Sequence, residues 1–219
     1  MILAQERNYK GPLGEFVYNT KDFEVLRQWG PMGIFEILKY RGHETDGDRI
    51  EIPKGIKDCS YMFEKCSLKT PPIIPIGVKN TSYMFKDCLS LTRGAVLPYG
   101  VVIASFMYAG CRQLRSVPGL PSTVRQAQYM CDTCSMLYEP PTLSENLENA
   151  SGMFRGCREM VKLADVPETC TKTDHIYRNC EKLKDILGDN YEAMRSDDEA
   201  FTFPVSEEDA VSDKGVVEE

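Results

Sequence analysis

The chain has 219 residues, 42% of them hydrophobic and 27% charged, which is the composition of an ordinary globular protein. Its longest apolar runs, such as 100–104, fall far short of the roughly 20 residues that cross a bilayer, so we expect no membrane insertion. The net charge of −7 is concentrated at the end, because residues 189–219 carry eleven acids and two bases. The near-neutral remainder lacks the basic surface that nucleic-acid binding requires, so we expect no nucleic-acid partner.

Residues 1–50 show no repeat and predict a small α+β N-terminal cap. Asn19 or Thr20 precedes a short helical pattern that Gly30 and Pro31 end, and 34–40 and 49–52 have the pattern of paired strands. We expect this segment to cover the open end of the repeats that follow. The first residues lack the basic start and long apolar core of a secretion signal, so we expect synthesis in the cytoplasm without a signal peptide.

From about residue 51 a unit of about 23 residues recurs six times. Each copy ends in a cysteine, and the spacings are 22 and then four times 23: Cys66, Cys88, Cys111, Cys134, Cys157, Cys180. A fixed period of this size is typical of stacked-coil solenoids.

Counting from each cysteine as position 0, the copies share further positions. Position −4 is Met or Ile, position −3 is mostly aromatic, position −7 is small, and position −13 is Pro in five copies. Ser82 and its equivalents at position −6 have side chains that accept hydrogen bonds from the first N–H groups of a helix. We therefore expect a short strand, a proline corner and one helical turn per coil, with Met84, Phe85 and Cys88 in the core.

In these positions the chain resembles the BspA-like leucine-rich repeats, whose unit has the form Val-x-x-Met-x-x-Met-Phe-x-x-Cys-x-x-Leu. Residues 78–91 carry the match, and the resemblance covers about residues 50–187. It departs at position −7, where Ala, Thr or Cys stands in place of the family's Met or Ile. The expected fold is a repeat solenoid of leucine-rich-repeat-like right-handed coils. Its predicted parts are the cap (1–50), six coils (51–187) and a closing segment with an acidic, flexible tail (188–219).

The resemblance also implies a function in binding. Proteins similar to this family include bacterial surface proteins, adhesins and phage-encoded proteins, which generally bind and do not catalyse. We therefore expect a non-enzymatic protein–protein interaction or structural module, an accessory or decorating component of a larger assembly such as a phage virion. The alternative is a bacterial cell-surface adhesin or host-binding protein. The expected partner is another protein, such as a neighbouring subunit, and not a small molecule.

Position −5 is the strongest candidate for a partner-binding surface, because it is aromatic in most coils and is expected to be partly exposed. The alternative is that its rings stack between coils and only shield them. In the tail, a short apolar stretch interrupts the acids and either docks on a neighbouring surface or stays solvated. The candidate partner-binding residues are Tyr61, Tyr83, Phe106, Tyr129 and His175 on the coils, with Phe201 and Phe203 in the tail.

The sequence offers little for metal, redox or catalytic chemistry. It has two histidines, His43 and His175, too few for a histidine cluster. Cys131 and Cys134 have the spacing of a redox or zinc motif, but the repeat already accounts for both positions. We therefore expect no catalytic residue, metal or cofactor, and cysteines that are reduced and face inward.

Overall fold

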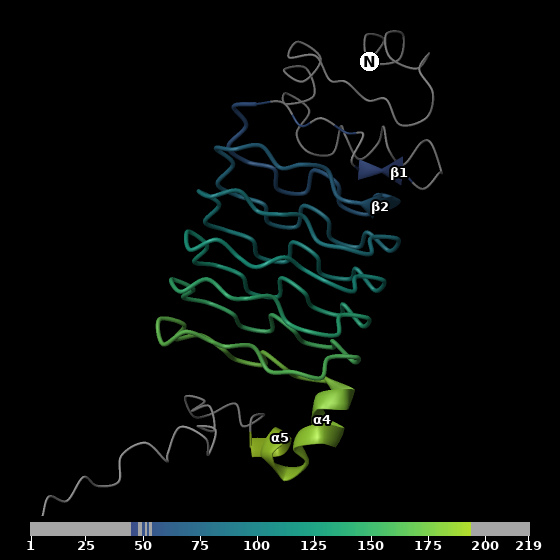
Figure 1. Cartoon of the computed structure of the whole chain (residues 1–219), viewed down its shortest axis with the longest axis vertical. Helices are drawn as coiled ribbons and strands as arrows, with labels where there is room; N and C mark the ends of the chain where they lie inside the picture. Colours follow the sequence, from purple (N-terminus) through teal and green to yellow (C-terminus); the bar gives the residue numbers. More distant parts are fainter. Residues whose placement is uncertain (1–44, 48–49, 51, 53, 194–219) are drawn as a thin grey trace, which may run out of the picture.

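The computed structural model describes residues 45–47, 50, 52 and 54–193, and within them the chain forms a stack of coils (Figure 1). Regular elements in these ranges are short: β1 Thr45–Asp46, β2 Leu68–Thr70, α4 Glu181–Leu187 and α5 Asp189–Ala193. β1 and β2 are parallel, and Thr45 lies opposite Leu68, 23 residues further on. The period thus already holds at Thr45, within the segment that the sequence assigns to the cap. We number the coils 1 to 6 by their cysteines, Cys66 to Cys180.

Neighbouring coils are joined at the spacing of the sequence repeat. Isolated parallel bridges link Asn80 to Ile103, Ile103 to Gln126, and Gln126 to Asn149. Backbone hydrogen bonds follow the same register, for example from the N–H of Ala104 to the carbonyl of Gln126, 2.8 Å away. The predicted repeat fold is therefore confirmed, and the structure replaces continuous strands with single bridges.

The predicted helical turn at the end of each coil is wrong. In coil 2 the N–H groups of Met84, Lys86 and Cys88 each bond to the carbonyl three residues earlier. Tyr83 and Asp87 have left-handed backbones, with φ of 59° and 58°. The corner is therefore a run of tight turns with a left-handed residue at positions −5 and −1.

The corner is not helical because its backbone N–H groups are used in hydrogen bonds between coils. The N–H groups of Tyr83, Phe85 and Asp87 donate to carbonyls of coil 3, so alternate amides in the corner hold the neighbouring coil. A helix would need these same groups for its own hydrogen bonds. The expected helix cap at Ser82 fails with the helix itself, and the Ser82 N–H donates to Oδ1 of Asn80 at 3.0 Å.

The core positions are confirmed. Met84, Phe85 and Cys88 are fully buried, as are their equivalents in most other coils. Each cysteine thiol from coil 2 onward donates to the carbonyl at position −3 of the preceding coil, at 3.0–3.2 Å. A small side chain with a weak donor fits this place, which explains why the position is cysteine and not alanine.

The two tyrosines at position −3 form hydrogen bonds that the phenylalanines at this position cannot form. The Tyr108 hydroxyl accepts from the Ala95 N–H at 2.8 Å and donates to the Ala95 carbonyl at 3.3 Å. Tyr177 accepts in the same way from the Ala164 N–H at 2.7 Å. In both coils the buried amide thirteen residues before the tyrosine is satisfied by its hydroxyl.

The last coil is closed by α4 and α5. The Tyr191 hydroxyl of α5 accepts from the Cys180 N–H at 2.9 Å and donates to the Tyr177 carbonyl at 2.7 Å. Tyr191 thus satisfies backbone groups at the end of coil 6. The predicted cap helix, the strand over 34–40, Phe201 and Phe203 lie outside the described residues. Among the helices within the described ranges, none is long and apolar enough to cross a membrane.

Candidate functional site

The structure brings four of the predicted site residues together in one ladder of rings. Tyr61, Tyr83, Phe106 and Tyr129 stack face to face in consecutive coils, with ring centroids 4.5, 4.7 and 4.9 Å apart and planes within 16° of parallel. Tyr61 at the upper end is 39% exposed, and the other three rings are half-buried. The ladder therefore offers a partner ring edges and hydroxyls, because neighbouring rings cover the faces.

The ladder ends at coil 5, where Gly152 occupies position −5. A Cβ on Gly152 would collide with the Tyr129 ring, which lies over the glycine. The Arg155 guanidinium covers that ring at 5.0 Å and pairs with both carboxylate oxygens of Asp132 at 2.8 Å. His175 in coil 6 is thus separated from the four rings by Gly152. Partner binding by these residues remains a prediction.

The ladder is held by an uncommon backbone. All four aromatic residues and His175 have φ between 55° and 60°, a region that bulky side chains rarely occupy. A left-handed residue costs roughly 1–2 kcal/mol, and the stacking of each pair contributes about 0.5–1.5 kcal/mol. Stacking of the rings therefore offsets much of the conformational cost of the left-handed residues that carry them. This favours a structural role of the ladder over a binding role.

The cysteines do not form a reactive site in the described part of the chain. All nine are free and buried. Burial raises the pKa of Cys66 and of Cys180 to about 12, and the pKa of Cys134 in the Cys-x-x-Cys pair is raised well above its ordinary value by burial first and by Cys131 second. Nor do the described residues contain a group of three His, Cys, Asp or Glu side chains able to hold a metal ion.

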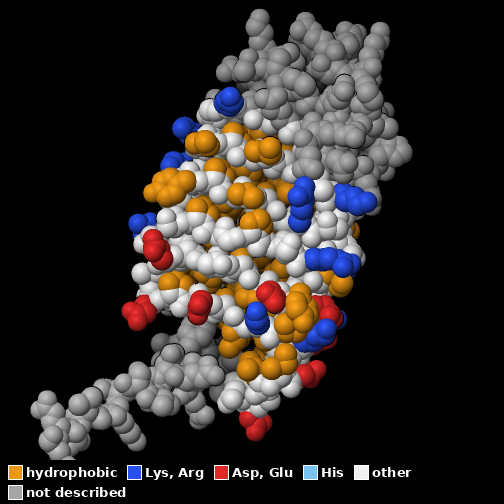
Figure 2. All heavy atoms as spheres, viewed as in Figure 1, with side chains coloured by type: hydrophobic (Ala, Val, Ile, Leu, Met, Phe, Trp, Pro, Cys, Tyr) orange, Lys and Arg blue, Asp and Glu red, His pale blue; other side chains and the backbone are white. Residues whose placement is uncertain are grey.

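A second surface is more exposed than the ladder, and we call it the coil 2–3 patch. It consists of four hydrophobic side chains that flank the proline corners of two adjacent coils: Ile73 (82% exposed), Ile76 (86%), Val96 (72%) and Tyr99 (74%). On the face drawn in Figure 2, hydrophobic side chains lie along the whole stack, and the acidic side chains lie from the middle of the stack downward. Exposed apolar groups that adjoin one another are typical of interaction sites.

Lysine ammonium groups border the patch. A Cβ on Gly77 would lie 3.5 Å from Nζ of Lys57, and one on Gly100 would lie 3.1 Å from Nζ of Lys79. Each ammonium therefore lies over the coil that follows its own, beside Ile76 or Tyr99. Neither lysine forms an ion pair with a residue in the described ranges, so both charges are available to a partner.

Sequence reasoning missed the coil 2–3 patch because it followed the positions that repeat. The signal lies in positions that do not repeat: position −12 is Ile76 and Tyr99 in coils 2 and 3, but Ser122, Glu145 and Glu168 in coils 4 to 6. A hydrophobic residue at an outward position that is polar elsewhere in the repeat indicates a local surface function.

Comparisons with known proteins identify the fold. No protein-family model matches the chain, and a search of curated proteins also finds no match. Among solved structures, the chain is similar to the crystal structure of a leucine-rich repeat protein of T. pallidum (TpLRR), with 20% sequence identity and a TM-score of 0.50. The match covers 65% of this chain and 79% of that chain. Together with the coil register, this similarity shows a repeat fold of the leucine-rich-repeat type.

Proposed function

We propose that the chain is a non-enzymatic protein-interaction module and that its partner covers the coil 2–3 patch. The observation that carries the proposal is the 72–86% exposure of Ile73, Ile76, Val96 and Tyr99 on two adjacent coils. Complete burial of four such side chains contributes roughly 6–12 kcal/mol before the costs of association. That is enough to anchor a specific contact.

The patch is a better candidate than the aromatic ladder. The rings of Tyr83 and Phe106 already contact rings on both faces, so a partner adds little burial there. Ile76 and Tyr99 are 86% and 74% exposed, so a partner can bury most of each side chain. The ladder residues and His175 remain a secondary proposal, in which ring edges and hydroxyls contribute at the rim of an interface.

The non-enzymatic part of the proposal is supported by the state of the nucleophiles. Burial raises the pKa of the Cys88 and Cys157 thiols well above the ordinary value, which leaves them protonated and unreactive at neutral pH. Repeat folds offer extended surfaces for binding, although a fold alone assigns no ligand.

Two finer proposals rest on the resemblance of the repeat unit to BspA-like repeats. The first is a right-handed solenoid that decorates a larger assembly such as a phage virion. The second is an adhesin on a bacterial surface. Mass spectrometry of purified virions and of surface-exposed proteins distinguishes them, because the chain would be recovered in only one of the two fractions.

The patch itself is tested by photo-crosslinking from Tyr99 in the producing host, with and without Ile76→Ser. The substitution puts a serine at position −12 of coil 2. Coil 4 already has a serine at that position, Ser122, so the fold should be unchanged. We expect a crosslinked partner whose yield falls at least fivefold in the variant. The matched control is Leu89→Ser, which removes a hydrophobic side chain that is 57% exposed and lies outside the patch. Equal yields in both variants would refute the patch as the partner site.

A further inference from the structure

We infer that the coil 2–3 patch is occupied by the acidic segment 197–209 of the same chain, which an external partner must displace. The inference rests on the proposed function of the patch and adds the identity of its resident ligand. It follows from the chemistry of the patch, the distribution of charge along the stack and the composition of the segment.

The patch requires a ligand that is both hydrophobic and acidic. Ile76 and Tyr99 supply exposed apolar surface, and the ammonium groups of Lys57 and Lys79 lie beside them without an ion pair to a described residue. Lys54, at position −12 of coil 1, is exposed at the upper edge. A ligand with apolar side chains flanked by carboxylates would satisfy both kinds of group.

The charge reverses along the stack, which restricts such a ligand to the upper coils. Residues 54–118 carry nine bases and three acids, a net charge of +6, whereas residues 119–193 carry eight bases and twelve acids, a net charge of −4. Position −9 is basic in coils 1, 2 and 4 (Lys57, Lys79, Arg125), whereas coil 5 has Glu148, which pairs with Arg125. An acidic ligand is therefore attracted to coils 1–3 and repelled from coils 5 and 6.

The segment 197–209 has the required composition. Its centre, 201–205, reads Phe-Thr-Phe-Pro-Val, with three acids on each side: Asp197, Asp198 and Glu199 before it, and Glu207, Glu208 and Asp209 after it. In an extended backbone Phe201 and Phe203 point the same way, because alternate side chains of an extended peptide share one face, so both can contact the patch. The carboxylates on both sides then fall near the lysines that border the patch.

The chain is long enough for the segment to reach the patch of its own molecule. Coil 3 lies three stacking steps of about 4.8 Å from coil 6, and the width of α5 adds about 10 Å. The distance to cover along the stack is therefore about 25 Å. The ten residues from Ala193 to Phe203 span up to about 34 Å when extended, so the segment can reach the level of coil 3 in its own molecule.

The test uses the full chain with a photoreactive p-benzoylphenylalanine in place of Phe203. After irradiation of the dilute protein, we expect crosslinks within one chain, to peptides that contain residues 73–99. Lys57→Glu together with Lys79→Glu should reduce their yield at least fivefold, and so should 1 M salt. Circular dichroism of each variant verifies that the coils remain folded.

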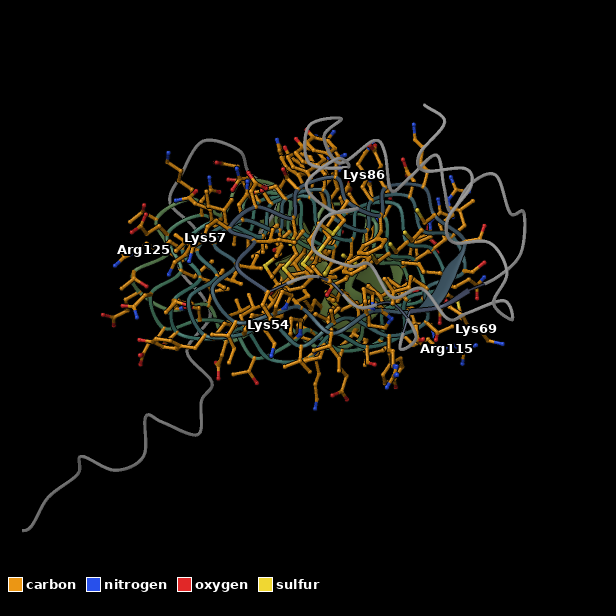
Figure 3. The ribbon with its side chains drawn as sticks, turned by 90° about the horizontal axis from the view of Figure 1, so that it is seen from above. Lys54, Lys57, Lys69, Lys86, Arg115 and Arg125 are labelled. Carbon is orange, nitrogen blue, oxygen red and sulfur yellow. The ribbon has the colours of Figure 1, made fainter. Side chains whose placement is uncertain are left out.

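The matched control reverses two charges on another side of the stack. Figure 3 shows Lys69 and Arg115 on the side of the stack away from Lys54 and Lys57. Lys69→Glu with Arg115→Glu makes the same change in net charge, so it should leave the crosslinks unchanged if the contact is local. A comparable loss in both double variants would overturn the inference.

The other outcomes are also decisive. Crosslinks between two chains would show that a second copy is the occupant, and an absence of crosslinks to 73–99 would show that the segment does not dock there; either result overturns the inference. If crosslinking from Phe203 fails while capture of a partner still depends on Ile76, the proposed function stands alone. If the segment docks but Ile76→Ser leaves partner capture unchanged, the proposed function fails and the inference stands.

Discussion

The hydrogen bond between Tyr108 and the backbone of Ala95 allows a sharp test of what this fold requires from its sequence. In three coils the residue thirteen positions before the core aromatic position is proline, which has no N–H: Pro72 before Phe85, Pro118 before Cys131, and Pro141 before Phe154. In coils 3 and 6 the residue is alanine, and there the core position is tyrosine. In coil 1 it is Ile50, whose N–H donates to Gly47 at 2.8 Å, and the core residue is again phenylalanine.

The substitution Tyr108→Phe should therefore destabilise the protein by about 2–3 kcal/mol, because it leaves the buried Ala95 N–H without an acceptor. The change Ala95→Pro removes that N–H and should cost about 1 kcal/mol alone, since the hydroxyl keeps the carbonyl as its acceptor. In the double variant no N–H is left unsatisfied. We expect it to be about as stable as Ala95→Pro, so the two changes are coupled by about 2 kcal/mol.

Urea denaturation of the four proteins, followed by circular dichroism, measures the free energies of unfolding. Tyr138→Phe is the control, since Tyr138 is 51% exposed; this substitution should change the free energy of unfolding by less than about 0.5 kcal/mol. The reasoning is refuted if Tyr108→Phe matches this control, or if the double variant is no more stable than Tyr108→Phe.

Three further perturbations follow from the corners and the thiols. Gly152→Ala should cost about 2 kcal/mol or more in urea denaturation, since φ is 60° and the new Cβ meets the Tyr129 ring; wild-type stability would contradict this. Thr133→Gly should gain about 0.5–1 kcal/mol, because a β-branched residue at φ 57° loses its strain at the smaller cost of a more flexible chain; a loss would refute the strain. Cys59, Cys66 and Cys180 have pKa values of about 12 in the folded protein, against 9.0 for an ordinary thiol. Between pH 9 and pH 12 these thiols therefore ionise in the unfolded chain but not in the folded one. The free energy of unfolding is highest below pH 9 and falls as the pH rises from 9 towards 12. Each thiol contributes about 1.4 kcal/mol per pH unit, so Cys66→Ala should reduce the slope of stability against pH, and an unchanged slope would contradict the assignment.

The sequence predicts the stack well because the same pattern of residues recurs in six coils. Met84, Phe85 and Cys88 each belong to a position that is apolar in nearly every coil, and only burial explains such regularity. The register follows for the same reason, since Asn80 and Ile103 must pair if equivalent residues stack.

The corner was predicted wrongly because three-residue spacing does not distinguish a helical turn from consecutive tight turns. Both place Met84 and Cys88 on one side, and both tolerate Ser82. The distinguishing signal is the residue at position −1, which is Gly110 and Gly156 in two coils and Asn179 in another. These residues favour a left-handed backbone, and a left-handed residue in each copy excludes a helix.

The same regularity that makes the fold predictable conceals the candidate site. The repeated aromatic residues Tyr61, Tyr83, Phe106 and Tyr129 are typical of a binding surface. Their rings, however, stack at 4.5–4.9 Å and mainly contact one another. Every coil needs its neighbours, so a repeated residue is explained by the interface between coils before any partner is invoked. Contacts between coils do not explain Ile76 and Tyr99, because coil 4 has the polar Ser122 at the same position. In a stacked repeat the residues to test for function are therefore those whose chemistry breaks the repeat on its outer side.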